Sequence, residues 1–258
     1  MNETLDVIER RRSTRAYTET PLTREEKDLI LHAAMRAPTA GNMMLYSIIE
    51  VEDQAVKDRL AVSCDNQPFI ATAPYVLLFA ADYQRWMDYF DLCGVKECSQ
   101  RLGRTLREPQ AGDLLLACCD AVIAAQTAVL AAESLGIGSC YIGDVLENYE
   151  FHRELFDLPR YAAPVCLLCF GRPQKEHTLE NRSSRFPREY IVSQNKYHRL
   201  SADEFHQMYR PIEERVAAGK GYASGVDNFG QATYLRKFIA EFSFEMSRSV
   251  AEMLKNWG

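Results

Sequence analysis

Arginine and hydroxyl side chains gather close to the N-terminus. The run Arg10-Arg11-Arg12-Ser13-Thr14-Arg15 places four guanidinium groups and two hydroxyls in six residues of a chain with a net charge of −6. Arginine offers a planar, permanently charged set of donors that matches a phosphate group, and the hydroxyls add further donors. A second run, Asn181-Arg182-Ser183-Ser184-Arg185, repeats this chemistry about 170 residues later. Together the two runs predict a site for one small anionic group; a solvated basic turn is the alternative interpretation of the first run.

The common signatures of protein-based catalysis are missing from the sequence. It contains no Gly-x-Gly-x-x-Gly, no Gly-x-x-x-x-Gly-Lys-Ser/Thr, no Gly-x-Ser-x-Gly and no His-Glu-x-x-His. Its five histidines are scattered, and each is expected to be a surface residue: His32, His152, His177, His198 and His206. With no evident nucleophile or acid–base pair, a cofactor that carries its own reactivity is expected.

Length and composition indicate an ordinary globular protein. The 258 residues are 47% hydrophobic and 26% charged, with no linker-like segment, so we expect one domain over residues 1–258. A pI near 5.5 argues against nucleic acid as a partner. The first residues are not those of a signal peptide. The apolar stretch at residues 114–135 is interrupted by Asp120, Gln126 and Glu133, which favours a buried helix over a membrane span. We therefore expect a cytoplasmic protein with no membrane partner.

The cysteines are expected to be reduced thiols rather than disulfides or metal ligands. The eight are Cys64, Cys93, Cys98, Cys118, Cys119, Cys140, Cys166 and Cys169. Cys166 and Cys169 have the spacing of a redox motif, but they lie in a strand-like run, which favours a core position. Cys93 and Cys98 lie in a more polar segment without further ligands nearby, and no metal site is expected.

Hydrophobic periodicity predicts helices around a sheet of four or five strands, an α+β fold. Helices are expected over residues 4–11, 23–36, 54–62, 113–135, 149–155, 201–218 and 232–257, and strands over 46–51, 75–81, 137–142 and 164–170. Two segments depart from this core. Residues 83–112 form a partly helical excursion, and residues from about 195 to 258 form a helical C-terminal extension.

The order and spacing of several motifs resemble those of the FMN-dependent nitroreductase family, in its major NADPH-linked nitroreductase and flavin reductase branch. The resemblance spans nearly the whole chain. It is carried by residues 9–17, by Ala37-Pro38-Thr39-Ala40-Gly41-Asn42, by Ala131-Ala132-Glu133-Ser134-Leu135-Gly136-Ile137-Gly138, by Tyr141-Ile142-Gly143, by Gly171-Arg172-Pro173 and by the C-terminal extension.

This resemblance implies a nitroreductase-like fold with a central, mostly antiparallel sheet. It also implies a homodimer with FMN at the interface and a C-terminal segment that embraces the partner subunit. By matched position, the FMN-binding residues would be Arg11, Ser13, Arg15, Thr39, Ala40, Gly41, Gln67, Tyr141, Ile142, Gly143, Asp144 and Arg185. In this assignment Arg11, Ser13, Arg15 and Arg185 hold the phosphate, and residues 39–41 come from the other subunit.

The activity implied is ping-pong hydride transfer from NAD(P)H, through FMN N5, to a nitroaromatic, a quinone or free flavin. No protein side chain would be catalytic. Two alternatives stay open: an FMN enzyme of different redox chemistry, dehalogenase- or oxidase-like, and a non-catalytic flavin-binding protein.

The sequence departs from the family pattern at three positions. Met44 replaces the usual Gln, Ser183 replaces the usual Lys, and Asp227 lies where relatives carry an Arg for the 2′-phosphate of NADPH. The choice between NADH and NADPH therefore stays open. The aromatic residues of the excursion, Tyr83, Trp86, Tyr89 and Phe90, are either core or a cover over the flavin.

Overall fold

The computed structural model describes residues 2–175, 177–178 and 183–258. The chain divides into two compact units, each described by itself. The first comprises Met1–Arg182 and Glu245–Gly258, and the second comprises Ser183–Phe244. The expectation of one domain over residues 1–258 stays a prediction.

A four-stranded antiparallel sheet forms the centre of the first unit. Its strands are β1 (Tyr46–Glu50), β2 (Tyr75–Asp82), β3 (Gly138–Ile142) and β4 (Ala162–Gly171), in the order β1-β2-β4-β3. The expected four strands and their antiparallel pairing are confirmed. All residues of β2 and β4 are buried because both faces of the sheet are covered.

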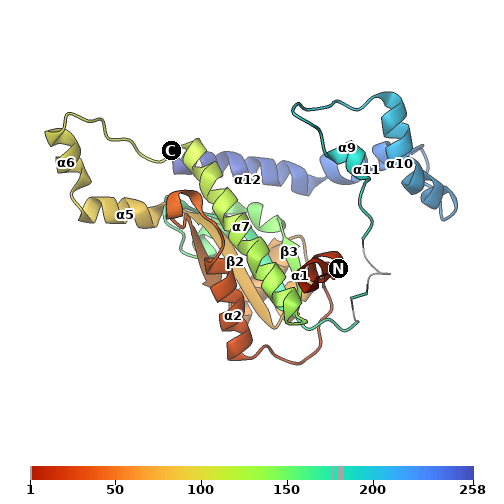
Figure 1. Cartoon of the computed structure of the whole chain (residues 1–258), viewed down its shortest axis with the longest axis horizontal. Helices are drawn as coiled ribbons and strands as arrows, with labels where there is room; N and C mark the ends of the chain where they lie inside the picture. The colour runs from red at the N-terminus through yellow and green to blue at the C-terminus, as the bar shows by residue number, and fades with distance from the viewer. Residues whose placement is uncertain (1, 176, 179–182) are drawn as a thin grey trace. The chain divides into compact units, whose positions relative to one another are not determined.

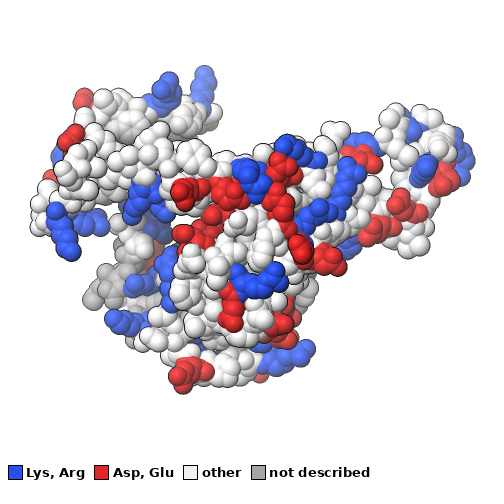
Figure 2. Space-filling model, turned by 180° about the vertical axis from the view of Figure 1, so that it is seen from behind, with Lys and Arg blue, Asp and Glu red and all other residues white. Residues whose placement is uncertain are grey.

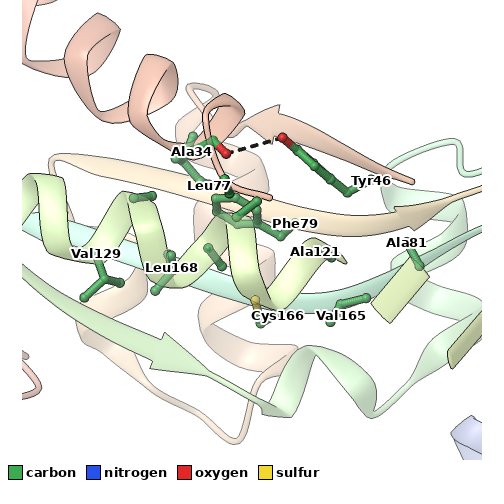
Figure 3. Packing of buried hydrophobic residues seen from close by; sticks show 14 of the residues in the cluster. Ala34, Tyr46, Leu77, Phe79, Ala81, Ala121, Val129, Val165, Cys166 and Leu168 are labelled. Atoms are coloured by element: carbon green, nitrogen blue, oxygen red, sulfur yellow. Dashed lines mark hydrogen bonds between the residues drawn. The ribbon is translucent and has the colours of Figure 1, made fainter. Parts of the chain in front are cut away.

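Helices cover the two faces with separate cores. On one face lie α2 (Arg24–Met35) and the long α7 (Ala111–Ser134), packed on Leu77, Phe79 and Leu168 as Figure 3 shows. On the other face, α3 (Gln54–Ser63) and α4 (Pro68–Thr72) pack on the alternate residues of the same strands. The alternation of side chains along each strand thus produces a three-layer arrangement (Figure 1).

Helix boundaries follow local signals. The capping box at Thr23 is present, with Thr23 N–H donating to Glu26 and Glu26 N–H donating to Thr23 Oγ1. Gly136 ends α7 with a φ of 72°, as expected for a left-handed C-terminal glycine. The helix begins at Ala111, earlier than expected from Asp113, because Asp113 accepts from Gln110 N–H and so occupies the first turn rather than the cap.

Further helices complete the first unit. They are α1 (Glu3–Arg10), η1 (Ala40–Asn42), α5 (Gln84–Leu92), α6 (Val95–Arg101), η2 (Asp144–Leu146), α8 (Tyr149–Leu155) and most of α12 (Glu241–Trp257). Residues 83–112, expected to be partly helical, contain α5 and α6, followed by a segment without helix before α7 begins. Within this excursion Tyr83 and Trp86 pack on the core while Tyr89 is exposed.

The second unit is helical, with α9 (Arg188–Ile191), α10 (Ala202–Ala217), α11 (Phe229–Thr233) and the π-helix η4 (Tyr234–Phe238). The sequence predicted one continuous helix over residues 232–257, and this is wrong. Ile239 N–H donates to Tyr234 O, a bond one residue longer than in an α-helix, so the regular ladder stops before α12 begins.

One helix in the described residues, α7, is long and apolar enough to cross a membrane. It packs against all four strands, and 44% of its most apolar window is buried. All eight cysteines are free, and Cys166 and Cys169 are buried core residues, as expected.

Candidate functional site

The segment that carries the first arginine cluster is held along the edge of the sheet. Thr14 N–H donates to Ser139 O at 2.8 Å, and Ser13 pairs with Ser139 in an isolated parallel bridge. The Tyr17 hydroxyl donates to Thr14 O at 2.8 Å. Thr14 and Tyr17 are therefore buried, while Ser13 and Arg15 are exposed. Edge pairing thus fixes which side chains of this segment can meet a ligand.

The guanidinium groups of this segment act electrostatically on neighbouring side chains of α7 and β3. Among the described residues, neither Arg11 nor Arg15 forms an ion pair, and the Arg15 guanidinium lies 5.9 Å from the centre of the Phe69 ring. Burial raises the pKa of the Cys140 thiol, and Arg15, a hydrogen bond with Ser13 and then Arg11 act against that rise. The three predicted phosphate-binding side chains therefore surround one residue of β3, with cationic charge available for an anion.

Behind this segment lies a contact that the sequence did not predict. His177 Nε2 is 3.1 Å from Thr14 Oγ1, and His177 Nδ1 is 3.7 Å from Glu133 Oε2. Burial raises the pKa of Glu133 to about 7, while burial, Arg12 and Arg11 lower that of His177. At neutral pH the imidazole is therefore uncharged and links Thr14 to α7.

The expectation that all histidines lie on the surface is wrong for His177 and for His152. His152 is fully buried, with Nδ1 2.7 Å from Glu147 O and Nε2 2.8 Å from Ser63 Oγ. An Nδ1–H donor and an Nε2 acceptor satisfy both contacts with a neutral ring, and burial lowers its pKa accordingly. His152 serves to join α3 to α8.

Two predicted ring-binding residues are joined directly. Gln67 Nε2 donates to Asp144 Oδ2 and to Cys64 O, both at 2.9 Å. Gln67 follows two left-handed residues, Asp65 with φ 59° and Asn66 with φ 51°, which turn the chain sharply into α4. This contact connects the start of α4 to the turn after β3. Both lie next to residues 11–15, the predicted phosphate segment.

The turn after β3 leaves open space where a flat group could approach. A Cβ built on Gly143 would meet no atom within 4 Å, and the φ of Gly143 is an ordinary −81°. Tyr141 is half-buried, and its hydroxyl donates to Gln126 Oε1 at 3.3 Å. Ile142 is a core residue, 1% exposed, so only its backbone is available to a ligand.

The loop containing Thr39, Ala40 and Gly41 lies elsewhere on α7. Its contacts are to Asp120, whereas the phosphate segment lies beside Glu133 at the far end of the helix. At 1.5 Å per residue, these two points are about 20 Å apart along the axis of α7. Within one chain, the loop and the phosphate segment are thus separate.

Asp120 itself was missed as a functional candidate. In the sequence, Asp120 indicated only that the apolar stretch is not a membrane span. A carboxylate in the middle of an Ala- and Cys-rich apolar helix was nevertheless a signal, because a buried charge requires hydrogen-bonding partners.

Arg185 belongs to the second unit and is exposed. Its Nη1 donates to Ser184 O at 3.0 Å. The pairing of Arg185 with Arg11, Ser13 and Arg15 stays a prediction. Asn181 and Arg182 of the second cluster lie outside the described residues.

The second unit has an aromatic hollow of about 540 Å³ next to residues 225–231. Tyr209 lies 5.7 Å from Phe229 between ring centres, and Phe205, His206 and Tyr234 also line the hollow. Asp227 N–H donates to Gln231 Oε1 at 2.8 Å, which ties this loop to the start of α11. Most of the residues that line the hollow are aromatic, and none of its described lining residues is an arginine.

The residues of the first unit fit a phosphate-bearing planar cofactor. The guanidinium groups of Arg11 and Arg15, which have no ion-pair partner in the described part of the chain, suit the phosphate together with an exposed hydroxyl. The open face of Gly143 beside Gln67 suits a flat ring. In the described part of the chain, no group of three His, Cys, Asp or Glu side chains is arranged to hold a metal ion. Basic and acidic side chains are intermixed on the face shown in Figure 2.

These features define a class of protein. The family model described as "Nitroreductase family" matches residues 8–172, and the chain belongs to that family. The resemblance inferred from the motifs is confirmed, and so is the nitroreductase-like α+β fold.

Individual relatives cover most of the chain. "Oxygen-insensitive NADPH nitroreductase" of Salmonella typhimurium is 32% identical over 84% of this chain and 79% of its own length. "FMN reductase (NADPH)" of Bacillus subtilis is 29% identical over 84% and 83% of the two chains. The solved structure of B. megaterium NfrA2 has a TM-score of 0.80 and 27% identity, covering 100% of this chain and 98% of that one.

Proposed function

We propose that this protein is an FMN-dependent oxidoreductase that uses a reduced nicotinamide to reduce nitroaromatics, quinones or free flavin. The observation that carries the proposal is the cluster of Arg11 and Arg15, which form no ion pair among the described residues, with exposed Ser13, next to the Gln67–Asp144 contact. Membership of the nitroreductase family, with relatives named as NADPH-linked FMN reductases and nitroreductases, supports it.

Each residue has a defined part in this proposal. Arg11, Ser13 and Arg15 bind the phosphate of FMN, with Arg185 as a further proposed contact. Gln67 and Asp144 bind the ring edge, and the backbone of Tyr141, Ile142 and Gly143 lies against the ring. Bound FMN supplies the chemistry of accepting and returning a hydride, so the protein contributes binding, orientation and exclusion of water.

We further propose that the active form is a homodimer with FMN at the interface. The loop at residues 39–41 lies about 20 Å along α7 from the phosphate segment, so a second copy is needed to bring both to one cofactor. The outer side of α7 also exposes a regularly spaced apolar stripe of Leu115, Leu116, Val122 and Ile123. The C-terminal extension embracing the partner and a cytoplasmic location belong to the same proposal.

The direct test is spectroscopic. Purified protein should be yellow, or become yellow with added FMN, and anaerobic stopped-flow mixing with NADH and with NADPH should bleach the flavin absorbance. The two rates measure the preference between NADH and NADPH. The sequence leaves this preference open, because residues 225–231 contain Asp227 and no arginine. Protein that neither carries nor takes up FMN would contradict the proposal. Retained FMN that neither donor reduces would favour a non-catalytic flavin-binding protein.

A further inference from the structure

The loop at residues 39–45 is organised around one carboxylate from another element. Asp120 of α7 is 2% exposed and accepts a hydrogen bond from the Thr39 hydroxyl. Ala40 N–H donates to Asp120 Oδ1 at 3.0 Å, and Leu45 N–H donates to Asp120 Oδ2 at 3.2 Å. The carboxylate thus holds both ends of the loop.

The loop is folded in a way that requires such support. Gly41, Asn42 and Met44 have φ values of 55°, 56° and 50°, so three of four consecutive residues are left-handed. For residues with side chains this conformation is unfavourable unless the surroundings hold it. Thr39 Oγ1 also accepts a hydrogen bond from Met44 N–H at 2.8 Å. The Thr39 hydroxyl therefore connects Asp120 to Met44, one of the left-handed residues.

The carboxylate depends on the loop in return. Among the described residues Asp120 forms no ion pair, so its charge is stabilised by the loop's N–H and O–H donors. A buried carboxylate without such donors is very unfavourable. If residues 39–45 left this position, the buried carboxylate of Asp120 would lose its hydrogen-bond donors. The observed conformation of the loop is therefore strongly preferred.

The opposite side of the loop is held by α5. Trp86 Nε1–H donates to Met43 O at 2.8 Å, and Arg85 Nη1–H donates to Met44 O at 3.3 Å. Gly41 and Asn42 at the tip remain exposed. The two ends of the loop are therefore held by hydrogen bonds to α7 and α5, while Gly41 and Asn42 are accessible to a ligand.

We propose that Asp120 is a positioning residue for the cofactor: it holds residues 39–45 in the one left-handed conformation that can line the flavin. This inference rests on the proposed function, which assigns Thr39, Ala40 and Gly41 to the FMN site. It adds a residue that does not itself touch the flavin and that acts through the loop.

The test uses full-length Asp120→Asn, with Asp113→Asn as a matched control. Asp113 is also a buried carboxylate of α7, but its partners Arg107, Gln110 and Tyr83 lie outside the loop. For Asp120→Asn, the Kd for FMN measured by flavin fluorescence should rise about tenfold or more, as expected for the loss of charge-assisted hydrogen bonds. Asp113→Asn should lower Tm and leave the Kd unchanged.

A second pair of variants approaches the same contact from the loop. Thr39→Val removes the bridging hydroxyl, whereas Thr39→Ser keeps it. Thr39→Val should weaken FMN binding and Thr39→Ser should restore it. This pair decides the matter if Asp120→Asn fails to fold. In FMN-free protein, hydrogen exchange of the amides of residues 40–45 should accelerate in Asp120→Asn and Thr39→Val, and not in Asp113→Asn.

The outcomes separate the two claims. An unchanged Kd for Asp120→Asn and Thr39→Val, in an unaltered protein that binds FMN, would overturn the positioning role and leave the proposed function standing. Failure of the unaltered protein itself to bind FMN would overturn the proposed function and this inference together.

Discussion

The side-chain amide of Gln67 donates to the carboxylate of Asp144, with 2.9 Å between Nε2 and Oδ2 and 77 residues between them in sequence. The same Nε2 donates to Cys64 O. Gln67 is therefore fixed at two points before any ligand arrives, which reduces the entropy that ring binding has to overcome.

Replacing Gln67 by leucine should weaken FMN binding. Gln67→Leu leaves Asp144 without its donor and frees the start of α4, and we expect the Kd for FMN to rise about tenfold. Gln54→Leu is the control, because Gln54 also donates to an aspartate, Asp58, but on the exposed side of α3. Equal affinities in fluorescence titrations of Gln67→Leu and Gln54→Leu would refute a role for Gln67.

Removing Arg15 should lower the affinity for FMN, which carries a phosphate, more than the affinity for riboflavin. In Arg15→Ala, affinity for FMN should fall roughly 10- to 100-fold through loss of a charged contact, while affinity for riboflavin, which lacks phosphate, should change little. Arg59→Ala removes another arginine that lies over a ring, that of Phe151 at 4.8 Å, and should affect neither ligand. A parallel loss of riboflavin binding in Arg15→Ala would place Arg15 against the ring instead.

Two glycines of the β3 region should respond differently to alanine. A Cβ on Gly138 would lie 2.9 Å from the Cβ of Thr14, so Gly138→Ala should push the phosphate segment off the edge and cost about 1–3 kcal/mol of stability. A Cβ on Gly143 meets nothing within 4 Å, so Gly143→Ala should keep its Tm and lose FMN affinity. Thermal melts and FMN titrations of both variants check this; a destabilised Gly143→Ala would contradict it.

Glu147 should make stability fall as the pH rises. Burial, followed by the charges of Asp144, Asp65 and Glu245, raises the pKa of this 5% exposed carboxyl from 4.5 to about 7. The folded state therefore binds its proton more tightly than the unfolded state. The associated stability is fully present below pH 4.5 and is lost as the pH rises through 7.

Glu147→Gln should remove this loss and stabilise the protein at pH 8 by on the order of 2 kcal/mol. Urea unfolding at pH 5 and pH 8 measures the effect, with Glu150→Gln as the control. Glu150 is exposed and paired with Arg248, which lowers its pKa. The idea fails if Glu147→Gln and the unaltered protein lose equal stability between the two pH values.

A charge on the apolar stripe of α7 should prevent dimer formation. Ile123→Glu places a carboxylate on this stripe, and light scattering should then report a monomer with weakened FMN binding. Val62→Glu alters an exposed apolar residue of α3 and should leave the dimer intact. A dimeric Ile123→Glu that retains FMN would rule out this face as the interface.

Local signals account for much of what could be predicted from the sequence. The capping box at Thr23 and the glycine after α7 were predictable because their partners lie within four residues. The strands could be recognised because buried β2 and β4 are continuous apolar runs. Motif order, which needs no folding, identified the family.

Contacts between distant segments could not be predicted in this way. The pairing of Asp120 with Ala40 spans 80 residues, and that of Thr14 with His177 spans 163. Both depend on how elements pack in space, which periodicity does not encode. The same holds for Gln67: its matched position predicts a contact with the flavin ring, whereas its contact with Asp144 depends on the fold.

The strand order has a consequence for the timing of folding. β4 lies between β2 and β3, yet it is the last strand in sequence, so the sheet cannot assemble before residue 171 has been synthesised. The segment with Arg11 and Arg15 borders β3, and Tyr17 pairs with Pro173. The pairing of this segment with the rest of the first unit is therefore complete only after residue 173, about two thirds of the way along the chain, has been synthesised.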